Sequence, residues 1–335
     1  MSHVFLDTHD GRLALYLNGD LQFDRDDERL YHEPLGLIPV ALAARRAEGR
    51  ALRVLVLGGG DGLALREIFR FSIVSEAHVV DRYAAVLALA RNGLAELNGR
   101  ALFDPRARVH VADARDFLSG ARDFDVVVCD LTYPRDLAGA AVFTIEFFER
   151  VRRALGPRGV VAVNAVSPEL TPEAFGCVAA TLGAAGLTSV PYAFELPSFL
   201  AEGYGRWGFL FASVEPITDD ELREIRLPDG TWLTSASFFS GTELPDAVLS
   251  VCSGAEERHG CWRGAPSVGG LGAISGPHGV GEALRASAGH VGAPHPNVTD
   301  ELLYYIANAT RITRGRRRFG AIGSWKHSSA ICSRV

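Results

Sequence analysis

Between residues 53 and 213, short apolar runs alternate with stretches of helical pattern, and this alternation restricts the possible folds more than any other feature of the chain. Uninterrupted apolar strands separated by helices are typical of a parallel sheet that helices cover on both faces. We therefore predict one doubly wound α/β sheet that ends near Ser213. The predicted strands are Val54–Leu57, Ala77–Val80, Arg108–Val111, Val126–Cys129, Val160–Val163, Leu187–Tyr192 and Trp207–Ala212. The predicted helices are Leu63–Arg70, Ala84–Leu97, Ile145–Leu155 and Pro172–Ala185.

The first 33 residues have a different pattern, in which short alternating runs are separated by the turn dipeptides Asp10-Gly11 and Asn18-Gly19. Such dipeptides between alternating runs are strong hairpin signals. Residues 1–33 are therefore predicted to form a small antiparallel β-hairpin unit, followed by the α/β domain at residues 34–250.

The last part of the chain, residues 251–335, is predicted to be a poorly ordered extension. Residues 254–281 contain nine glycines and no apolar period, which is typical of a linker or mobile loop. One helical pattern follows at residues 299–312, and a basic run at residues 314–318 begins a polar tail.

Composition excludes several classes of protein. The chain has 34 Lys and Arg against 40 Asp and Glu, a net charge of −6, which disfavours nucleic acid as a partner. It has neither a run of about 18 apolar residues nor the charged-then-apolar start of a signal peptide, so we expect a cytoplasmic protein with no membrane contact. Its five scattered cysteines form no CxxC pair and, with His259, fit no usual zinc spacing, so neither disulfides nor a metal is expected.

A glycine-rich turn follows the first strand of the α/β domain and precedes a helix. It reads Gly58-Gly59-Gly60-Asp61-Gly62. Glycines let the backbone approach a ligand closely. A carboxylate here would repel a pyrophosphate, so Asp61 indicates a ligand with a cationic group; the alternative is that Asp61 only caps the helix that follows.

Acidic residues also end the next three strands. Asp81 ends the second, about twenty residues after the glycines, where an acid can accept hydrogen bonds from ribose hydroxyls. Asp113, followed by Ala114, ends the third strand and Asp130 the fourth. Ligands of open α/β sheets bind at these carboxyl ends, so four acids in register predict a ligand site more readily than four helix caps.

These motifs together resemble those of the polyamine aminopropyltransferases, the spermidine and spermine synthases, over residues 10–213. The fold that the resemblance implies is a seven-stranded, Rossmann-like, doubly wound sheet of the class I methyltransferase type. The matching motifs are the strand and glycine turn from Val54 to Glu67, Gln22, Asp27-Glu28, Tyr31-His32-Glu33, Asp113-Ala114, Asp130 before Pro134, Pro197-Ser198-Phe199 and Trp207-Gly208-Phe209.

The resemblance implies transfer of a 3-aminopropyl group from decarboxylated S-adenosylmethionine to an amine, with release of methylthioadenosine. That donor is a co-substrate, and no prosthetic group is implied. Gln22 is then expected on the nucleoside side, Asp81 at the ribose and Asp113 at the adenine amino group. Gly58, Gly59, Gly60, Asp61 and Ala114 complete the expected donor site.

The acceptor is expected to be a polyamine, whose amines have an ordinary pKa of about 10.4 and arrive protonated. Asp130 is the predicted group that orients the attacking amine and accepts its proton, with Tyr31 hydrogen-bonded nearby. His32 and Glu202 are further candidates for the acceptor site. The alternatives are that His32 is a buried residue bonded to the backbone and that Glu202 is a solvated surface acid.

Two departures from the family pattern concern the substrate. Tyr133 stands where spermidine synthases commonly have a second aspartate, so the identity of the acceptor is left open between putrescine and a longer or different amine. Tyr83 likewise replaces an acid after the ribose-binding strand. Two other functions therefore stay open: a methyltransferase on the same fold, and a catalytically degenerate nucleoside-binding relative. By resemblance to the family, a homodimer or homotetramer is expected, and the hairpin unit offers an edge for a partner subunit.

Overall fold

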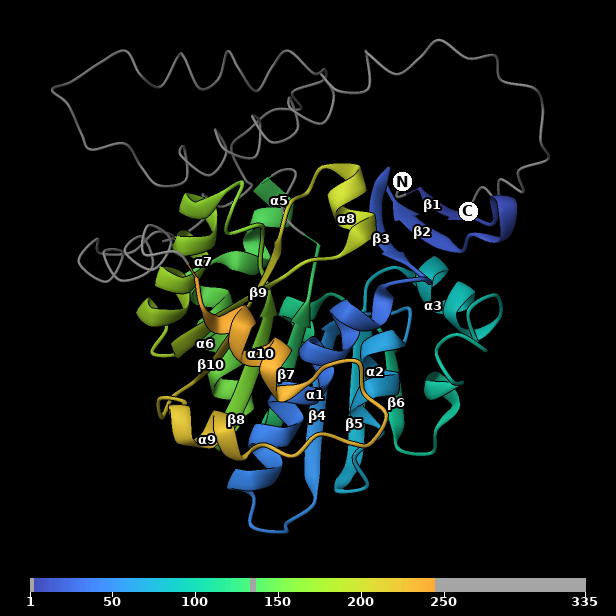
Figure 1. Cartoon of the computed structure of the whole chain (residues 1–335). Coiled ribbons are helices and arrows are strands. Elements are labelled where there is room, and N and C mark those ends of the chain that lie inside the picture. The colour runs from blue at the N-terminus through green and yellow to red at the C-terminus, as the bar shows by residue number, and fades with distance from the viewer. Residues whose placement is uncertain (1–2, 133–136, 245–335) are drawn as a thin grey trace, which may run out of the picture.

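The computed structural model describes residues 3–132 and 137–244 (Figure 1). Tyr133 and the predicted C-terminal extension with its helix at residues 299–312 lie outside the described residues. Within the described part, the strands form two sheets, one of three strands and one of seven. No helix in this part is both long and apolar enough to cross a membrane.

The three-stranded sheet is the predicted hairpin unit. Its strands β1 (Val4–Asp7), β2 (Ala14–Leu17) and β3 (Asp20–Asp24) pair antiparallel in chain order. Asn18 and Gly19, at the turn between β2 and β3, both have positive φ values of 54° and 87°. A two-residue turn of this type matches the twist of the strands it joins, so this hairpin prediction is confirmed.

All seven predicted strands of the larger sheet are present, in the order β6-β5-β4-β7-β8-β10-β9. The predicted doubly wound α/β class is therefore confirmed. Their bounds are β4 (Leu52–Gly58), β5 (Val74–Asp81), β6 (Ala107–Val111), β7 (Phe124–Asp130), β8 (Leu155–Asn164), β9 (Thr188–Phe194) and β10 (Trp207–Ser213).

The sheet is not wholly parallel, and this part of the prediction is wrong. β10 runs antiparallel to both of its neighbours, β8 and β9. The helix between β9 and β10 is α8 (Pro197–Glu202), which packs on β3 at the carboxyl edge instead of crossing a face of the sheet. The chain therefore turns back at the edge where β9 ends, and β10 returns in the opposite direction.

The longest described helix, α1 (Glu28–Arg46), lies where no helix is predicted, and it spans the predicted domain boundary between residues 33 and 34. Pro34, Gly36 and Pro39 lie inside it, which hides the helical pattern because proline and glycine disfavour helix interiors. Burial outweighs this local preference: Leu35, Leu37, Ile38, Val40 and Leu42 are completely buried.

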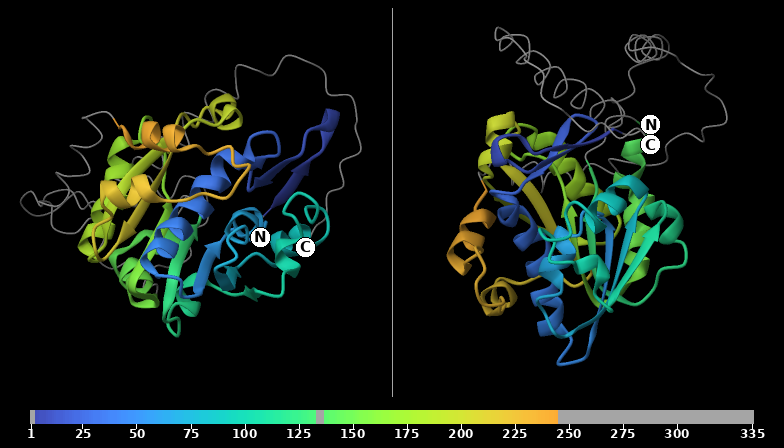
Figure 2. Two further views of the ribbon diagram at one scale, coloured as in Figure 1. Left: turned by 60° about the horizontal axis from the view of Figure 1, so that its bottom comes forward. Right: turned by 90° about the vertical axis from the view of Figure 1, so that its right-hand side faces the viewer.

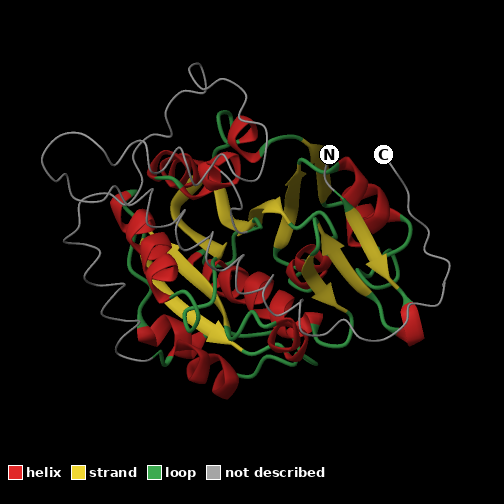
Figure 3. Ribbon diagram, turned by 90° about the horizontal axis from the view of Figure 1, so that it is seen from above, coloured by secondary structure: helices red, strands yellow, loops and turns green. Residues whose placement is uncertain are grey.

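Helices cover both faces of the large sheet (Figures 2 and 3). Residues of β4 alternate between two cores: Val54 and Val56 pack with α1 and α2 (Leu63–Ile68), whereas Leu55 and Leu57 belong to the core under the helices of the opposite face. The helices of that face are α4 (Ala114–Phe117), α6 (Ile145–Ala154) and α7 (Pro172–Ala184).

The remaining helices are short. α3 stops earlier than predicted because Asn92-Gly93 follows it, and residues 92–100 form turns. Beyond Ser213, where the sheet is predicted to end, the chain continues to pack on the sheet within the predicted domain at residues 34–250, since Phe238 of α10 is 1% exposed. The bounds of these remaining helices are η1 (His9–Gly11), α3 (Ala84–Arg91), η2 (Ala101–Phe103), α5 (Leu137–Ala140), η3 (Ala141–Phe143), α9 (Asp219–Glu224) and α10 (Ser235–Thr242).

Candidate active site

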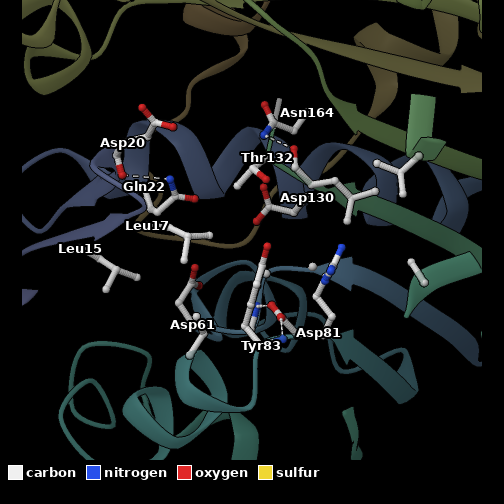
Figure 4. A pocket seen from close by; sticks show the side chains of 18 of the residues that line it. Leu15, Leu17, Asp20, Gln22, Asp61, Asp81, Tyr83, Asp130, Thr132 and Asn164 are labelled. Carbon is white, nitrogen blue, oxygen red and sulfur yellow. Dashed lines mark hydrogen bonds between the residues drawn. The ribbon is translucent and has the colours of Figure 1, made fainter. Parts of the chain in front are cut away.

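A cavity lies at the carboxyl ends of β4, β5 and β7, where the strand order changes direction and open α/β sheets bind ligands. The hairpin unit lines it through β2 and β3, and α8 through Phe199. Figure 4 shows the labelled acids Asp20, Asp61, Asp81 and Asp130 around one space.

The glycine turn brings the ends of three strands together. Gly58 has a φ of +80°, and a side chain there would collide with the backbone carbonyl of Asp130. At Gly60, a side chain would collide with the carboxylate of Asp81, to which the Gly60 N–H donates a hydrogen bond of 3.1 Å. These two positions require glycine because of close approach, as the sequence suggests.

Asp61 lies both at the start of α2 and in the cavity lining. Its Oδ1 accepts a hydrogen bond of 2.8 Å from the backbone N–H of Leu63, which supports the start of α2. It also lines the cavity and is 9% exposed. A backbone contact of this kind uses one carboxylate oxygen and leaves lone pairs for a cationic ligand.

Asp81 and Asp113 lie at the strand ends of the predicted nucleoside side, in opposite electrostatic environments. Burial raises the pKa of Asp81 even though the N–H groups of Gly60 and Tyr83 donate to its carboxylate. The side chain of Arg115 lowers the pKa of Asp113 through two hydrogen bonds of 3.0 Å. Ala114, the first residue of α4, lines the cavity beside Asp113.

Asp130 and Tyr31 form a direct pair. The Tyr31 hydroxyl donates to Asp130 Oδ1 at 2.8 Å, across 99 positions of sequence. Burial, followed by the nearby charge of Asp61, raises the pKa of Asp130 to about 6. Burial and the charge of Asp130 also hold the pKa of Tyr31 well above its usual value, so the phenol stays protonated and donates a hydrogen bond to the carboxylate.

Behind this pair, a buried network holds His32. Its Nδ1 contacts the backbone carbonyl of Glu28 at 2.8 Å and the Glu28 carboxylate at 3.0 Å, while Arg66 pairs with both Glu28 oxygens. Burial alone would lower the pKa of His32, but the contact with Glu28 raises it. His32 is therefore bonded to the backbone, and it also lines the cavity.

The other predicted site residues have different outcomes. Gln22 lines the cavity, and its Nε2 donates to the backbone carbonyl of Asp20 at 3.1 Å. Glu202 does not belong to the cavity lining; its carboxylate accepts a hydrogen bond of 3.2 Å from the Tyr16 hydroxyl. Tyr133 lies outside the described residues.

Asp20, Arg82 and Asn164 also line the cavity, although none of them is predicted from the sequence. Asp20 lies two positions before Gln22 on β3, so period-2 alternation could have placed both on one face. Asn164 ends β8 as the aspartates end their strands, but an amide gives no charge signal. Five aspartates and one arginine thus line the described part of the cavity, which favours a cationic ligand.

No group of three or more histidine, cysteine or acidic side chains in the described residues is arranged to hold a metal ion. The buried thiol of Cys129 lies next to Asp130 in the chain, and burial raises its pKa, so it stays protonated. The titratable groups that line the described part of the cavity are the five aspartates, Arg82, His32, Tyr31, Tyr83 and Tyr204.

Comparisons with known proteins agree with this geometry. A family model described as the spermine/spermidine synthase domain matches residues 28–219. "Polyamine aminopropyltransferase 2" of Ralstonia nicotianae is 39% identical over 204 residues, 60% of this chain and 38% of that protein. "Polyamine aminopropyltransferase" of Mycobacterium tuberculosis is 37% identical over 242 residues, 70% of this chain and 44% of that protein. The matched parts thus span only about two fifths of these relatives.

Two solved structures have the same fold. The spermidine synthase of Thermotoga maritima has a TM-score of 0.61 at 24% identity, covering 75% of this chain and 83% of that one. A spermidine synthase in complex with the transition-state analogue AdoDATO has a TM-score of 0.63 at 24% identity, covering 75% and 84%.

Proposed function

The chain belongs to the spermine/spermidine synthase family, and from that premise we propose that it transfers a 3-aminopropyl group from decarboxylated S-adenosylmethionine to an amine of the polyamine class. The observation that carries the proposal is the Tyr31–Asp130 pair in a cavity that Asp61 and Asp81 also line. This arrangement combines an acid-lined donor site with a carboxylate that can receive a proton.

The donor carries a sulfonium and a terminal ammonium but no carboxylate. Asp61 faces such a cation favourably and would repel the carboxylate of ordinary S-adenosylmethionine, which disfavours the methyltransferase alternative. Asp81 would accept hydrogen bonds from the ribose hydroxyls, as the acid at this strand end does in dinucleotide-binding folds, and Asp113 would accept one from the adenine amino group.

The acceptor amine must lose a proton before it can attack carbon. Asp130 takes that proton, and the free nitrogen attacks the methylene next to sulfur; the new C–N bond forms as the C–S bond breaks, so methylthioadenosine leaves as a neutral thioether. The Tyr31 hydroxyl holds the carboxylate in place. Alignment of nitrogen, methylene and sulfonium in one line contributes the rest of the acceleration.

An acceptor panel tests this proposal. Purified protein is incubated with the decarboxylated donor and putrescine, cadaverine, agmatine, spermidine or spermine, and products are identified by mass. We expect an aminopropyl adduct and, because Tyr133 replaces the second aspartate, reaction with an acceptor other than putrescine. Reaction of putrescine alone would contradict the inference from Tyr133, and tight methylthioadenosine binding without any product would favour the degenerate relative.

The homodimer or homotetramer and the cytoplasmic location expected from the sequence stay predictions. Light scattering of the purified protein tests the first, and fractionation of cells that express the full chain tests the second.

A further inference from the structure

The side chain of Asn164 connects two strands at the edge of the cavity. Its Oδ1 accepts a hydrogen bond of 2.7 Å from the Trp207 indole N–H, and its Nδ2 donates one of 3.1 Å to the backbone carbonyl of Leu131. It is 7% exposed and lines the cavity, where Figure 4 shows it near Thr132 and Asp130.

The topology explains how one side chain reaches both partners. β8 lies between β7 and β10, and Asn164 is its last residue. Leu131 directly follows β7, whose carboxyl end lies at the same edge. Because β10 is antiparallel to β8, the first residues of β10 lie beside the last residue of β8. Asn164 therefore pairs with Phe209. A fully parallel sheet would place Trp207 at the opposite edge.

Chemistry fixes the orientation of this amide. The indole N–H of Trp207 can only donate, and the Leu131 carbonyl can only accept, so the oxygen and nitrogen of Asn164 have one arrangement that satisfies both. A carboxylate would set an oxygen against the Leu131 carbonyl, and an apolar side chain of similar size would satisfy neither partner.

Both partners belong to the cavity wall. Leu131 follows Asp130 in the chain, so a hydrogen bond to the Leu131 carbonyl holds the backbone directly after that carboxylate. The Trp207 ring packs edge-on against Phe199 at 5.2 Å between centroids and against Tyr204 at 6.2 Å, and all three rings line the cavity. Aromatic faces attract ammonium groups and pack against methylene chains.

We propose that Asn164 is a positioning residue of the acceptor half of the site, which holds the Trp207 indole and the backbone after Asp130 at a fixed spacing. The alkyl chain of the amine then lies along the aromatic wall while its nitrogen meets Asp130. This inference rests on the proposed function. It predicts that Asn164 affects binding of the amine and not of the nucleoside, whose expected contacts are Asp81 at the end of β5 and Asp113 just before α4.

Asn164→Leu and Trp207→Phe test the proposal. The first removes both hydrogen bonds; the second removes the indole N–H but keeps a ring. Calorimetry measures the Kd of spermidine for protein saturated with methylthioadenosine, and the Kd of methylthioadenosine itself. We expect each variant to weaken amine binding and lower kcat/KM for the amine about ten-fold, as for a lost buried hydrogen bond, with methylthioadenosine affinity unchanged.

The double variant and a control sharpen the test. Because both substitutions break the same Asn164–Trp207 bond, Trp207→Phe should cost little more in the Asn164→Leu background. Asn92→Asp changes an exposed amide that donates to the Ala88 carbonyl at 2.7 Å, and it should leave both affinities unchanged.

Amine affinity that is unchanged in both variants, or methylthioadenosine affinity that falls as much as amine affinity, would overturn the positioning role. A wild-type protein that transfers nothing to any amine would instead overturn the proposed function. The amine-binding measurement needs no turnover, so it decides the role of Asn164 in either case.

Discussion

Asp113 and Asp130 show how surroundings give the same residue type different chemistry. Asp113 is held as a charged acceptor by Arg115, which lowers its pKa and suits it to bind a ligand N–H. At Asp130, burial outweighs the lowering effects of the His32 charge and the Tyr31 hydrogen bond and raises the pKa to about 6. Under the proposed function, this value is closer to the pKa of the amine whose proton Asp130 would accept. The two carboxylates thus suit binding and proton transfer respectively.

The central residue prediction concerns Asp130. Asp130→Asn keeps the size of the side chain but removes the proton acceptor, so turnover should fall by about 10²- to 10⁴-fold, the usual effect of lost acid–base help. Methylthioadenosine affinity should stay nearly the same. Equal loss of turnover and methylthioadenosine binding would mean instead that Asp130 supports the structure of the site.

The pH dependence follows from the same carboxylate. Asp130 must be charged to accept a proton, so kcat/KM should rise with pH through an inflection near pH 6. The Tyr31 hydrogen bond lowers the pKa of Asp130, and Tyr31→Phe should therefore move this inflection to higher pH. Tyr16→Phe, which removes a hydroxyl bonded to Glu202 outside the cavity lining, is the control and should leave the inflection in place.

Among single residues, the sequence predicts the charged members of the cavity lining better than the neutral ones. Asp61, Asp81, Asp113 and Asp130 all line the cavity because each ends a strand or follows one at the same edge. Asn164 also ends a strand at this edge, but its contact with Trp207 depends on β10 lying antiparallel beside β8. A local sequence pattern does not predict such a pairing between distant strands.

Among the elements, the turn after β4 is the most sensitive to substitution. Gly60→Ala would place a methyl group against the Asp81 carboxylate, so we expect a loss of stability of about 1–3 kcal/mol, as in overpacked sites, and weaker methylthioadenosine binding. Gly120→Ala, which has no atom within 4 Å of the added carbon, should change neither. Denaturant unfolding and calorimetry measure both effects, and a Gly60→Ala protein that binds normally would contradict the close approach.

The contact between α1 and α2 depends on buried charge. Arg66 of α2 pairs with Glu28 at 2.8 Å and with Glu67 at 2.7 Å, and both acids are 2% exposed. Arg66→Met leaves them without this cation, so the free energy of unfolding should fall by about 3–5 kcal/mol. Arg100→Met breaks an exposed pair with Glu96 and should cost less than about 1 kcal/mol. Similar losses in the two variants would contradict the role given to the buried network.

The sequence does not predict the elements that depend on contacts between residues far apart in the chain. The strands and β-hairpins are predicted correctly because period and turn residues are local signals. In α1, Pro34 and Pro39 disrupt the helical sequence pattern, so the helix is not predicted. Burial against the sheet stabilises it nevertheless. The direction of β10 depends on α8 lying at the carboxyl edge, which the residues of β10 alone do not indicate.

In the whole molecule, contacts between distant segments fix the wall of the cavity. Asp27, just before α1, accepts hydrogen bonds of 2.7 and 2.8 Å from the backbone and hydroxyl of Ser198 on α8. Glu202 at the end of α8 accepts one from Tyr16 of β2. The hairpin unit and α8 are thereby tied together beside the acid-lined end of the large sheet. The family match covers 28–219, which includes that sheet and α8 but not the hairpin strands.

We propose that this acid-lined cavity selects the decarboxylated donor. The most direct measurement gives the protein equal amounts of decarboxylated and ordinary S-adenosylmethionine with spermidine and the other amines, and identifies the products by mass. We expect aminopropyl adducts together with methylthioadenosine, and no methylated amine. Methylated products, with S-adenosylhomocysteine released in place of methylthioadenosine, would contradict it.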